Sequence, residues 1–352
     1  MGSPINEYGM RDRDNESDKA YEAEIENIPR PVAARQAGFG GKAKRHCARW
    51  WWVHLIVFCL GFLIISLCLV YVAMPHIANH GVKESHLELT ELQFLNPTPD
   101  TVVLTQKAIL HSPSIYTPTL DPFNATLWLV TNGTFATAPL NILTMPRIHA
   151  LHPKSNASVV NQEVALLSQD QIAEYATQVL SNKNVSTALT GKTNLHEGHL
   201  PTLKINYNTT LTYAGLNGLA GFNVTGAKVN FTAATGTPNM KGFAYIPNPS
   251  VITVALGNVT LSLATAKTGI LGNATIQDMT VSPGNNTLPL TAFINQTQIL
   301  SAMDPDSGLV DLIITGTSSV YNGQHIVYYE KALASNVLHL NLNVKQIIAD
   351  SV

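Results

Sequence analysis

The chain has 352 residues and a formal net charge of −2 at pH 7, with 21 Lys and Arg against 23 Asp and Glu. This length allows two or three domains of ordinary size, and the near-neutral charge excludes the overall basic field typical of nucleic-acid-binding proteins. The charge is concentrated at the start: residues 1–49 carry nine Lys/Arg and eight Asp/Glu, whereas the 278 residues after Met74 carry only twelve and fifteen. That later part is rich in Thr, Asn, Gly, Val and Leu, a composition typical of an all-β protein with many turns.

Residues 1–49 are predicted to be a disordered cytosolic tail with a basic cluster next to the membrane. Residues 1–41 lack apolar periodicity and have the composition of a disordered segment. A basic cluster then precedes an apolar segment, formed by Lys42, Lys44, Arg45 and Arg49. Such clusters stay on the cytosolic side of a membrane and can contact anionic headgroups. Cys47, inside the cluster, is a candidate for acylation, with an unmodified juxtamembrane cysteine as the alternative.

Residues 50–74 form an apolar segment without a charged residue, and they predict a transmembrane helix. A bilayer core needs about 20 apolar residues in helical form, so the segment is long enough to cross. Its ends carry aromatic side chains that suit the membrane interface, namely Trp50, Trp51, Trp52 and Tyr71. The length argues against a buried core helix, and the 49 polar residues before the segment argue against a signal peptide.

The two flanks of this segment predict its direction. Beyond it only Lys83 follows soon, so the N-terminus is expected in the cytosol and residues after about 75 in a lumen or outside the cell. The positions of the N-glycosylation sequons support the same orientation, because only the sequon at Asn15 precedes the apolar segment. The candidates after it are Asn124, Asn132, Asn156, Asn184, Asn208, Asn223, Asn230, Asn258, Asn273, Asn285 and Asn295. Some sequons arise by chance in such a sequence, so the one-sided distribution, rather than any single site, indicates a type II single-pass protein.

The sequence after the apolar segment contains an internal repeat. Asn96-Pro97 and Asn248-Pro249 open similar stretches, and each is followed about 40 residues later by Pro-Leu. Further on, "LTGKTNLHEGH" matches "ITGTSSVYNGQ". Three markers in the same order predict two copies of one module, at 85–215 and 216–352.

Short alternating runs such as "VITVAL", "NVTLSLA", "ATIQDMTV", "LVDLIIT" and "VLHLNLNV" predict half-buried strands. Strands with turn signals at roughly ten-residue spacing favour a sandwich or a barrel in each copy. Proline is expected at a bend or an edge of a strand, where no ladder partner is needed. A capped helix with an apolar stripe is predicted over 168–182, with a shorter counterpart near 297–303.

The stretches "YIPNPSVITVALGNVTLSLA", "LGNATIQDMTVSPGNNTLPLTAFINQT" and "GTSSVYNGQHIVYYEKALASNVLHLNLNV" resemble a family of ascomycete single-pass membrane proteins with a luminal domain of unknown function. Its members often carry the label "pre-rRNA processing protein". The resemblance covers about 220–352. The family is similar to type-two late embryogenesis abundant sandwiches and to the yeast vacuolar protein that helps to end autophagy. The resemblance implies two tandem immunoglobulin-like β-sandwiches, a vacuolar or other endomembrane setting, and lipid held in a groove or between the sheets.

Few residues suggest a catalytic or metal-binding site. In His196-Glu197-Gly198-His199 the two histidines are three residues apart, whereas a zinc-protease helix needs four, so a hairpin turn is the favoured interpretation. Asp304, Asp306 and Asp311 miss the spacing of a calcium loop and suit a turn. No cysteine follows Cys68, so the later part has neither a thiol nucleophile nor a disulfide. We therefore expect no catalytic residue, metal site or cofactor.

Three hypotheses for the function follow. The favoured one is a non-enzymatic protein, anchored in an endomembrane that is expected to be the vacuolar membrane, whose tandem sandwich binds a hydrophobic ligand such as lipid. The endoplasmic reticulum and the plasma membrane are alternative locations. The second is an interaction or signalling protein that uses the sandwiches as recognition modules and the tail to engage a cytosolic partner. The third is a luminal hydrolase. A nucleic-acid partner is not expected, because the luminal Lys and Arg are scattered and lack interleaved aromatic residues.

Overall fold

The computed structural model describes residues 39–114, 116–234 and 236–351, with the side chains of 39–49, 79 and 81–83 outside this description. The chain forms two compact units that divide between Leu63 and Ile64. The predicted tail up to residue 38, with Asn15, lies outside the described residues. The same is true of the side chains of the basic cluster and of Cys47.

Helix α1 (Phe39–Cys68) contains the first part of the apolar segment and is interrupted at Trp50, where φ is −120° and ψ is 18°. A π-helical turn (Leu69–Ala73) leads into α2 (Met74–Glu84). Within the described residues, one helix is long and apolar enough to span a membrane, Trp50–Ala78, which extends the predicted segment by four residues. Residues 39–49, predicted as part of the disordered tail, are helical, and their Ala, Lys and Arg residues are good helix formers.

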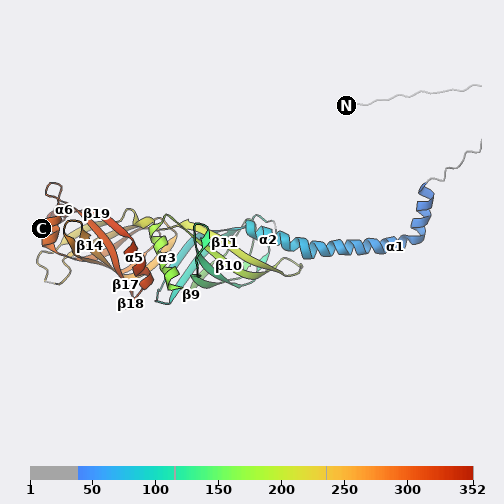
Figure 1. The fold of residues 1–352 in the computed structure, drawn as a ribbon, viewed down its shortest axis with the longest axis horizontal. Helices are drawn as coiled ribbons and strands as arrows, with labels where there is room; N and C mark the ends of the chain where they lie inside the picture. The colour runs from blue at the N-terminus through green and yellow to red at the C-terminus, as the bar shows by residue number, and fades with distance from the viewer. Residues whose placement is uncertain (1–38, 115, 235, 352) are drawn as a thin grey trace, which may run out of the picture. The chain divides into compact units, whose positions relative to one another are not determined.

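The rest of the chain is built from two β-sheets (Figure 1). The main path of the larger sheet runs through β12 (Asn223–Val229), β13 (Met240–Asn248), β16 (Gly284–Ile294), β15 (Gly269–Val281), β14 (Ile252–Thr265), β1 (His86–Leu95), β2 (Thr101–His111) and β8 (Lys154–Asn156). Its remaining strands are β9 (Val159–Ala165), β17 (Leu309–Tyr321), β18 (Gln324–His325) and β19 (Val337–Asn343). The smaller sheet contains β3 (Thr119–Leu120), β4 (Phe123–Thr131), β5 (Thr134–Phe135), β6 (Asn141–Met145), β7 (Ile148–His149), β10 (Asn184–His196) and β11 (Leu203–Ala214).

The predicted fold class, an all-β sandwich after a single apolar helix, is confirmed. Strands such as β4 and β6 alternate buried and exposed residues along their length, as the period of two in the sequence requires. The inward side chains form one continuous core that includes the fully buried Leu104, Leu143, Leu189, Ile246 and Val259. No disulfide can form in this part of the chain, because it contains no cysteine. The fold is therefore stabilised mainly by burial of apolar surface.

One parallel strand pair joins the two predicted copies. β1 lies beside β14, with Leu92 opposite Ile252 and Phe94 opposite Val254. Strands from both sides of residue 215 therefore belong to the same 12-stranded sheet. The origin of the two halves as copies of one module stays a prediction, whereas their joining into one sheet is a feature of the structure.

The second Asn-Pro motif marks a change of strand position. β13 ends at Asn248, Pro249 lies in the connection, and β14 begins at Ile252 in another place in the same sheet, with β16 and β15 between the two strands. Pro247 is opposite Asn285 of β16, beyond the last residue of β13 that pairs with β12. The two prolines therefore stand where a ladder partner is missing on one side or where the chain leaves the ladder, as proline requires.

Candidate functional site

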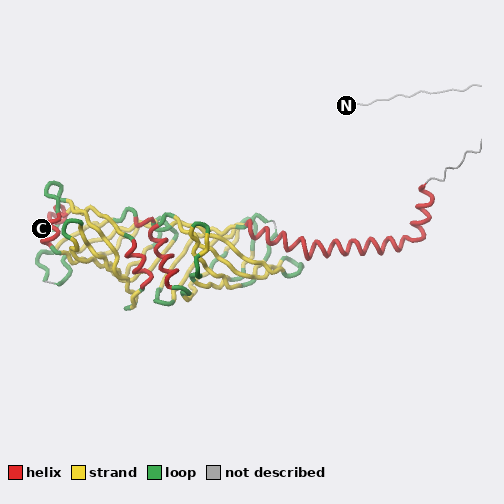
Figure 2. Tube along the Cα trace, in the orientation of Figure 1, coloured by secondary structure: helices red, strands yellow, loops and turns green. Residues whose placement is uncertain are grey.

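Two helices cover one region of the sandwich. They are α3 (Gln169–Ser181) and α5 (Val327–Ser335), and they pack against each other although they are far apart in the sequence. Figure 2 shows them side by side among strands and loops. The predicted capping residue of α3 is confirmed, because the side chain of Ser168 accepts a hydrogen bond from the N–H of Gln171. The helix starts one residue later and ends one residue earlier than predicted.

Polar contacts tie the two helices and their strands together. Lys331 of α5 pairs with Asp170 of α3 at 3.0 Å, and the hydroxyl of Tyr328 donates to the carbonyl oxygen of Thr98 at 3.2 Å. The hydroxyl of Tyr321 donates to Oδ1 of Asn96 at 2.8 Å. The first Asn-Pro motif, Asn96-Pro97, thus contacts elements of the second predicted copy.

A cavity of about 70 Å³ lies beneath α3 and α5. The volume is several times the roughly 10–15 Å³ that one water molecule needs. Its walls are almost entirely apolar side chains from both helices and from β1, β2 and β14, among them Phe94, Val102, Ile172, Val179, Ile252, Val254, Ala332 and Leu333. Water in such a space finds few hydrogen-bond partners, so the cavity favours an apolar occupant.

The few polar atoms near this cavity differ in whether they have a hydrogen-bond partner. Oδ1 of Asn141, which lines the cavity, is buried and has no hydrogen-bond partner among the described residues. The hydroxyls of Tyr175 and Tyr213 are bonded to each other at 2.9 Å. Burial raises the pKa of Tyr213 to about 12 and raises the pKa of Tyr175 well above its ordinary value. The tyrosines therefore stay neutral, and Asn141 offers the cavity an unused acceptor.

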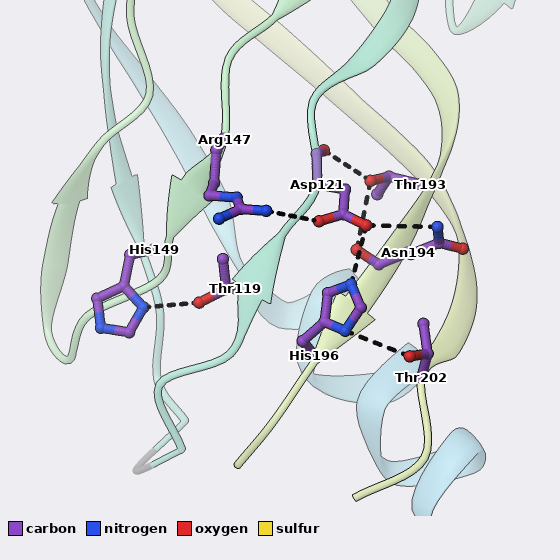
Figure 3. Close-up of polar contacts among 8 residues, drawn as sticks. All are labelled: Thr119, Asp121, Arg147, His149, Thr193, Asn194, His196 and Thr202. Atoms are coloured by element: carbon purple, nitrogen blue, oxygen red, sulfur yellow. Dashed lines mark hydrogen bonds and ion pairs between the residues drawn. The ribbon is translucent and has the colours of Figure 1, made fainter. Parts of the chain in front are cut away.

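A polar cluster lies in the smaller sheet, and it gathers residues that are distant in the sequence (Figure 3). Nε2 of His196 is 2.8 Å from Oδ2 of Asp121, and Nδ1 of the same ring is 3.3 Å from Oγ1 of Thr202. Arg147 donates to the other carboxylate oxygen of Asp121 at 3.4 Å. The hydrogen bond from His196 holds the pKa of Asp121 below its ordinary value.

We interpret this cluster as a structural connection between strand ends. It connects residues at or beside the ends of β3, β7, β10 and β11. Thr193 adds a 2.8 Å hydrogen bond to the carbonyl oxygen of Asp121. The residue types of Asp121, His196 and Thr202 match a catalytic triad, in which a carboxylate orients a histidine base beside a hydroxyl nucleophile. Both carboxylate oxygens of Asp121, however, already have other partners, including the exposed Arg147. A connection between strand ends accounts for every one of these contacts.

The two other candidate clusters are turns. His196 ends β10 and Glu197 to His199 lie in the connection to β11, so the segment is a hairpin turn and not a zinc-binding helix. Oδ1 of Asp304 accepts hydrogen bonds from the N–H groups of Asp306 and Ser307, at 3.1 and 2.8 Å, as turn chemistry requires. Among the described residues, no group of three or more His, Cys, Asp or Glu is arranged to hold a metal ion.

The candidate glycosylation residues share one property: every sequon asparagine after the apolar helix is exposed. They are Asn124, Asn132, Asn156, Asn184, Asn208, Asn223, Asn230, Asn258, Asn273, Asn285 and Asn295. Several use Oδ1 as an acceptor, for example Asn295, which caps α4 (Gln296–Ala302), and Asn258, which binds the N–H of Asp278. In the hydrogen bonds found among the described residues, none of the eleven donates through Nδ2, the atom to which a glycan is attached.

The interface residues of the apolar helix, Trp50, Trp51, Trp52 and Tyr71, are exposed, as side chains that face lipid must be. The two Asn-Pro motifs differ in their surroundings. Asn248 is buried and bonds to its neighbours, whereas Asn96 is exposed with φ at +47°. Sequence reasoning missed the cavity beneath α3 and α5, the pairing of Asp121 with His196, and the buried Oε2 atom of Glu197. The one available signal was the apolar stripe of α3.

Comparison with known proteins gives one family match. Residues 138–263 match a family described as a protein of unknown function (DUF3712). The matched segment runs from the first predicted copy into the second, so it only partly coincides with residues 220–352, where the sequence resemblance was noted. No curated protein matches the chain.

Solved structures also match the chain. One is a crystal structure of a protein from Archaeoglobus fulgidus, with 12% identity, covering 36% of this chain and 96% of that chain, at a TM-score of 0.18. A similarity at this level supports no inference about fold or function.

Proposed function

We propose that this chain is a single-pass type II membrane protein whose β-sandwich binds a hydrophobic ligand such as lipid and performs no catalysis. The observation that carries the proposal is the apolar cavity beneath α3 and α5. Its two helices are joined to each other by an exposed ion pair, Lys331 with Asp170, which contributes about 1 kcal/mol or less. An acyl chain longer than the closed cavity would enter by separating the two helices, and this ion pair adds little to the cost of that separation.

Asn141 supports the same proposal. A buried acceptor without a partner costs about 1–3 kcal/mol, and the loss is recovered when a ligand donates a hydrogen bond to it. Oδ1 of Asn141 would then orient the polar end of the ligand, while the surrounding Leu127, Leu140 and Leu166 contact its apolar part. This combination of an apolar wall and a single polar group is typical of small-molecule sites.

Filling the cavity is expected to abolish binding. Ala332 of α5 is buried and lines the cavity, so Ala332→Leu places three additional carbon atoms where the ligand would lie. We expect the full-length variant to take up cis-parinaric acid, a fluorescent fatty acid whose protonated carboxyl can donate to Asn141, at least about tenfold more weakly than the unmodified protein.

Ala334→Leu is the matched control, because Ala334 lies on the exposed side of the same helix. Fluorescence titration of the three purified proteins measures the difference. Equal uptake by all three, with thermal unfolding unchanged, would rule out this cavity as the binding site.

We place residues after about 75 on the non-cytosolic side of an endomembrane, which the family resemblance suggests is the vacuolar membrane. The basic cluster before the helix and the exposure of all eleven later sequons support this orientation. Peptide N-glycosidase treatment is expected to increase the gel mobility of the full-length protein, and protease added to sealed vesicles should leave residues 84–352 intact. Unchanged mobility together with digestion of that part would show the opposite orientation.

A further inference from the structure

A second cavity, of about 80 Å³, lies where the apolar helix meets the sandwich. One wall is formed by Met74, Ile77 and Ala78 of α2, and the other walls include Leu120, Ala150 and Tyr207. The residues from α2 are also the last residues of the candidate membrane span, Trp50–Ala78. The helix that can cross the bilayer therefore forms part of the cavity.

The length of the span places this cavity at the level of the headgroups. A helix of 29 residues is about 44 Å long at 1.5 Å per residue. The hydrocarbon core takes about 30 Å of that length, and the headgroup regions bring the bilayer to about 40–45 Å. The last turn of the span, with Met74 to Ala78, then lies at the interface, within reach of lipid molecules in the bilayer.

One polar atom in this cavity is without a partner. Glu197, in the turn between β10 and β11, lines the cavity, and its Oε2 is buried with no hydrogen-bond partner among the described residues. A carboxylate oxygen accepts hydrogen bonds, and a buried acceptor left without a partner costs free energy. A hydrogen-bond donor on a ligand would remove that cost, whereas an ionised fatty acid has only acceptor oxygens and would leave Oε2 without a partner.

We propose that this cavity is a second binding site, which takes from the bilayer an amphiphile whose polar end is a hydrogen-bond donor. The hydroxyl of a sterol and the ammonium of a sphingoid base share this chemistry. The apolar body lies against Ile77, Leu120 and Tyr207, and the donor binds Oε2 of Glu197. The site is separate from the cavity beneath α3 and α5 and depends on the proposed function only for the membrane insertion of the helix.

The test uses the full-length protein in phosphatidylcholine vesicles that contain photoactivatable, clickable cholesterol, sphingosine or fatty acid at equal mole fractions. We expect the cholesterol probe, the sphingosine probe, or both to label peptides that line this cavity at least about tenfold more than the fatty acid probe. Free cholesterol should compete with the cholesterol probe, and cholesteryl methyl ether, which lacks the donor, should not. Labelling by one donor probe alone identifies the headgroup.

Variants of Glu197 separate the hydrogen bond from the charge. Glu197→Gln keeps an acceptor oxygen, so it should retain the cholesterol probe and weaken the sphingosine probe. Glu197→Leu should remove the discrimination between cholesterol and its methyl ether. Glu163→Leu is the matched control, because Glu163 is an exposed carboxylate of β9 that does not line the cavity.

Two results would overturn the inference. One is equal labelling by the donor and fatty acid probes. The other is unchanged selectivity in a Glu197→Leu protein that unfolds at the same temperature as the unmodified one. Label found only on α3 or α5 would also count against this site, while leaving the proposed function in place. Ala150→Phe, which fills the second cavity, should abolish the specific labelling without affecting uptake at the first.

Discussion

Replacement of Gly257 by alanine is expected to lower the free energy of unfolding of the sandwich by about 3 kcal/mol or more. Gly257 lies inside β14 at a φ of +71° and interrupts the pairing register with β15. A Cβ atom at this position would lie 2.3 Å from the carbonyl oxygen of Val320 in β17. The close approach of two backbones and the left-handed conformation both require glycine here.

Gly284→Ala is the control for the backbone conformation alone. Gly284 has a φ of +93° but no atom within 4 Å of the position of an added Cβ. We expect this variant to cost only about 1 kcal/mol, from backbone strain. Guanidinium unfolding of both full-length variants in the same detergent, followed by far-ultraviolet circular dichroism, measures the difference. Equal losses would mean that β14 and β17 are not as close as the structure shows.

Asn248→Ala is expected to cost about 3 kcal/mol of unfolding free energy. Nδ2 of Asn248 donates to the carbonyl oxygen of Ile252 at 2.8 Å, and Oδ1 accepts from the N–H and the hydroxyl of Ser250 at 2.9 and 2.6 Å. All three residues are buried, so removal of the amide leaves several polar groups without partners. These bonds hold the connection in which the chain leaves β13 and enters β14.

The asparagine of the first Asn-Pro motif provides the comparison. Asn96 is exposed, and Oδ1 has one partner, the hydroxyl of Tyr321. Asn96→Gly keeps a residue that accepts the positive φ and should cost under about 1 kcal/mol. The same unfolding measurement applies to both variants. A larger loss at Asn96 than at Asn248 would contradict the structural roles assigned to the two motifs.

The features that the sequence predicted well are local ones. The apolar helix, the capped helix α3 and the hairpin turn after His196 each depend on residues within a short window. The two alternating runs "VITVAL" and "NVTLSLA" predict separate strands. The structure makes them one strand, β14, with an irregularity at Gly257. β15 pairs with residues on both sides of Gly257, and β17 approaches Gly257 from elsewhere in the chain, contacts that the two runs do not reveal.

The candidate sites depend on contacts between distant residues, which periodicity cannot reveal. The cavity beneath α3 and α5 is lined in part by β1 and β14, a parallel pair that joins residues about 160 positions apart. Its wall residues have the composition of an ordinary β core, so nothing in the sequence separates lining residues from packed ones. Glu197 attracted attention as part of a zinc-like motif, whereas its importance in the structure is a buried carboxylate oxygen beside the membrane helix.

The most direct test of lipid binding is mass spectrometry of the lipids that remain with the full-length protein after purification from membranes and extensive detergent exchange. The Ala332→Leu variant, purified in parallel, corrects for lipids that adhere to the apolar helix. We predict a lipid species that remains with the unmodified protein in an amount comparable to the protein itself and is strongly depleted in the variant. Identical lipid profiles for the two proteins would contradict the proposal that the sandwich holds lipid beneath α3 and α5.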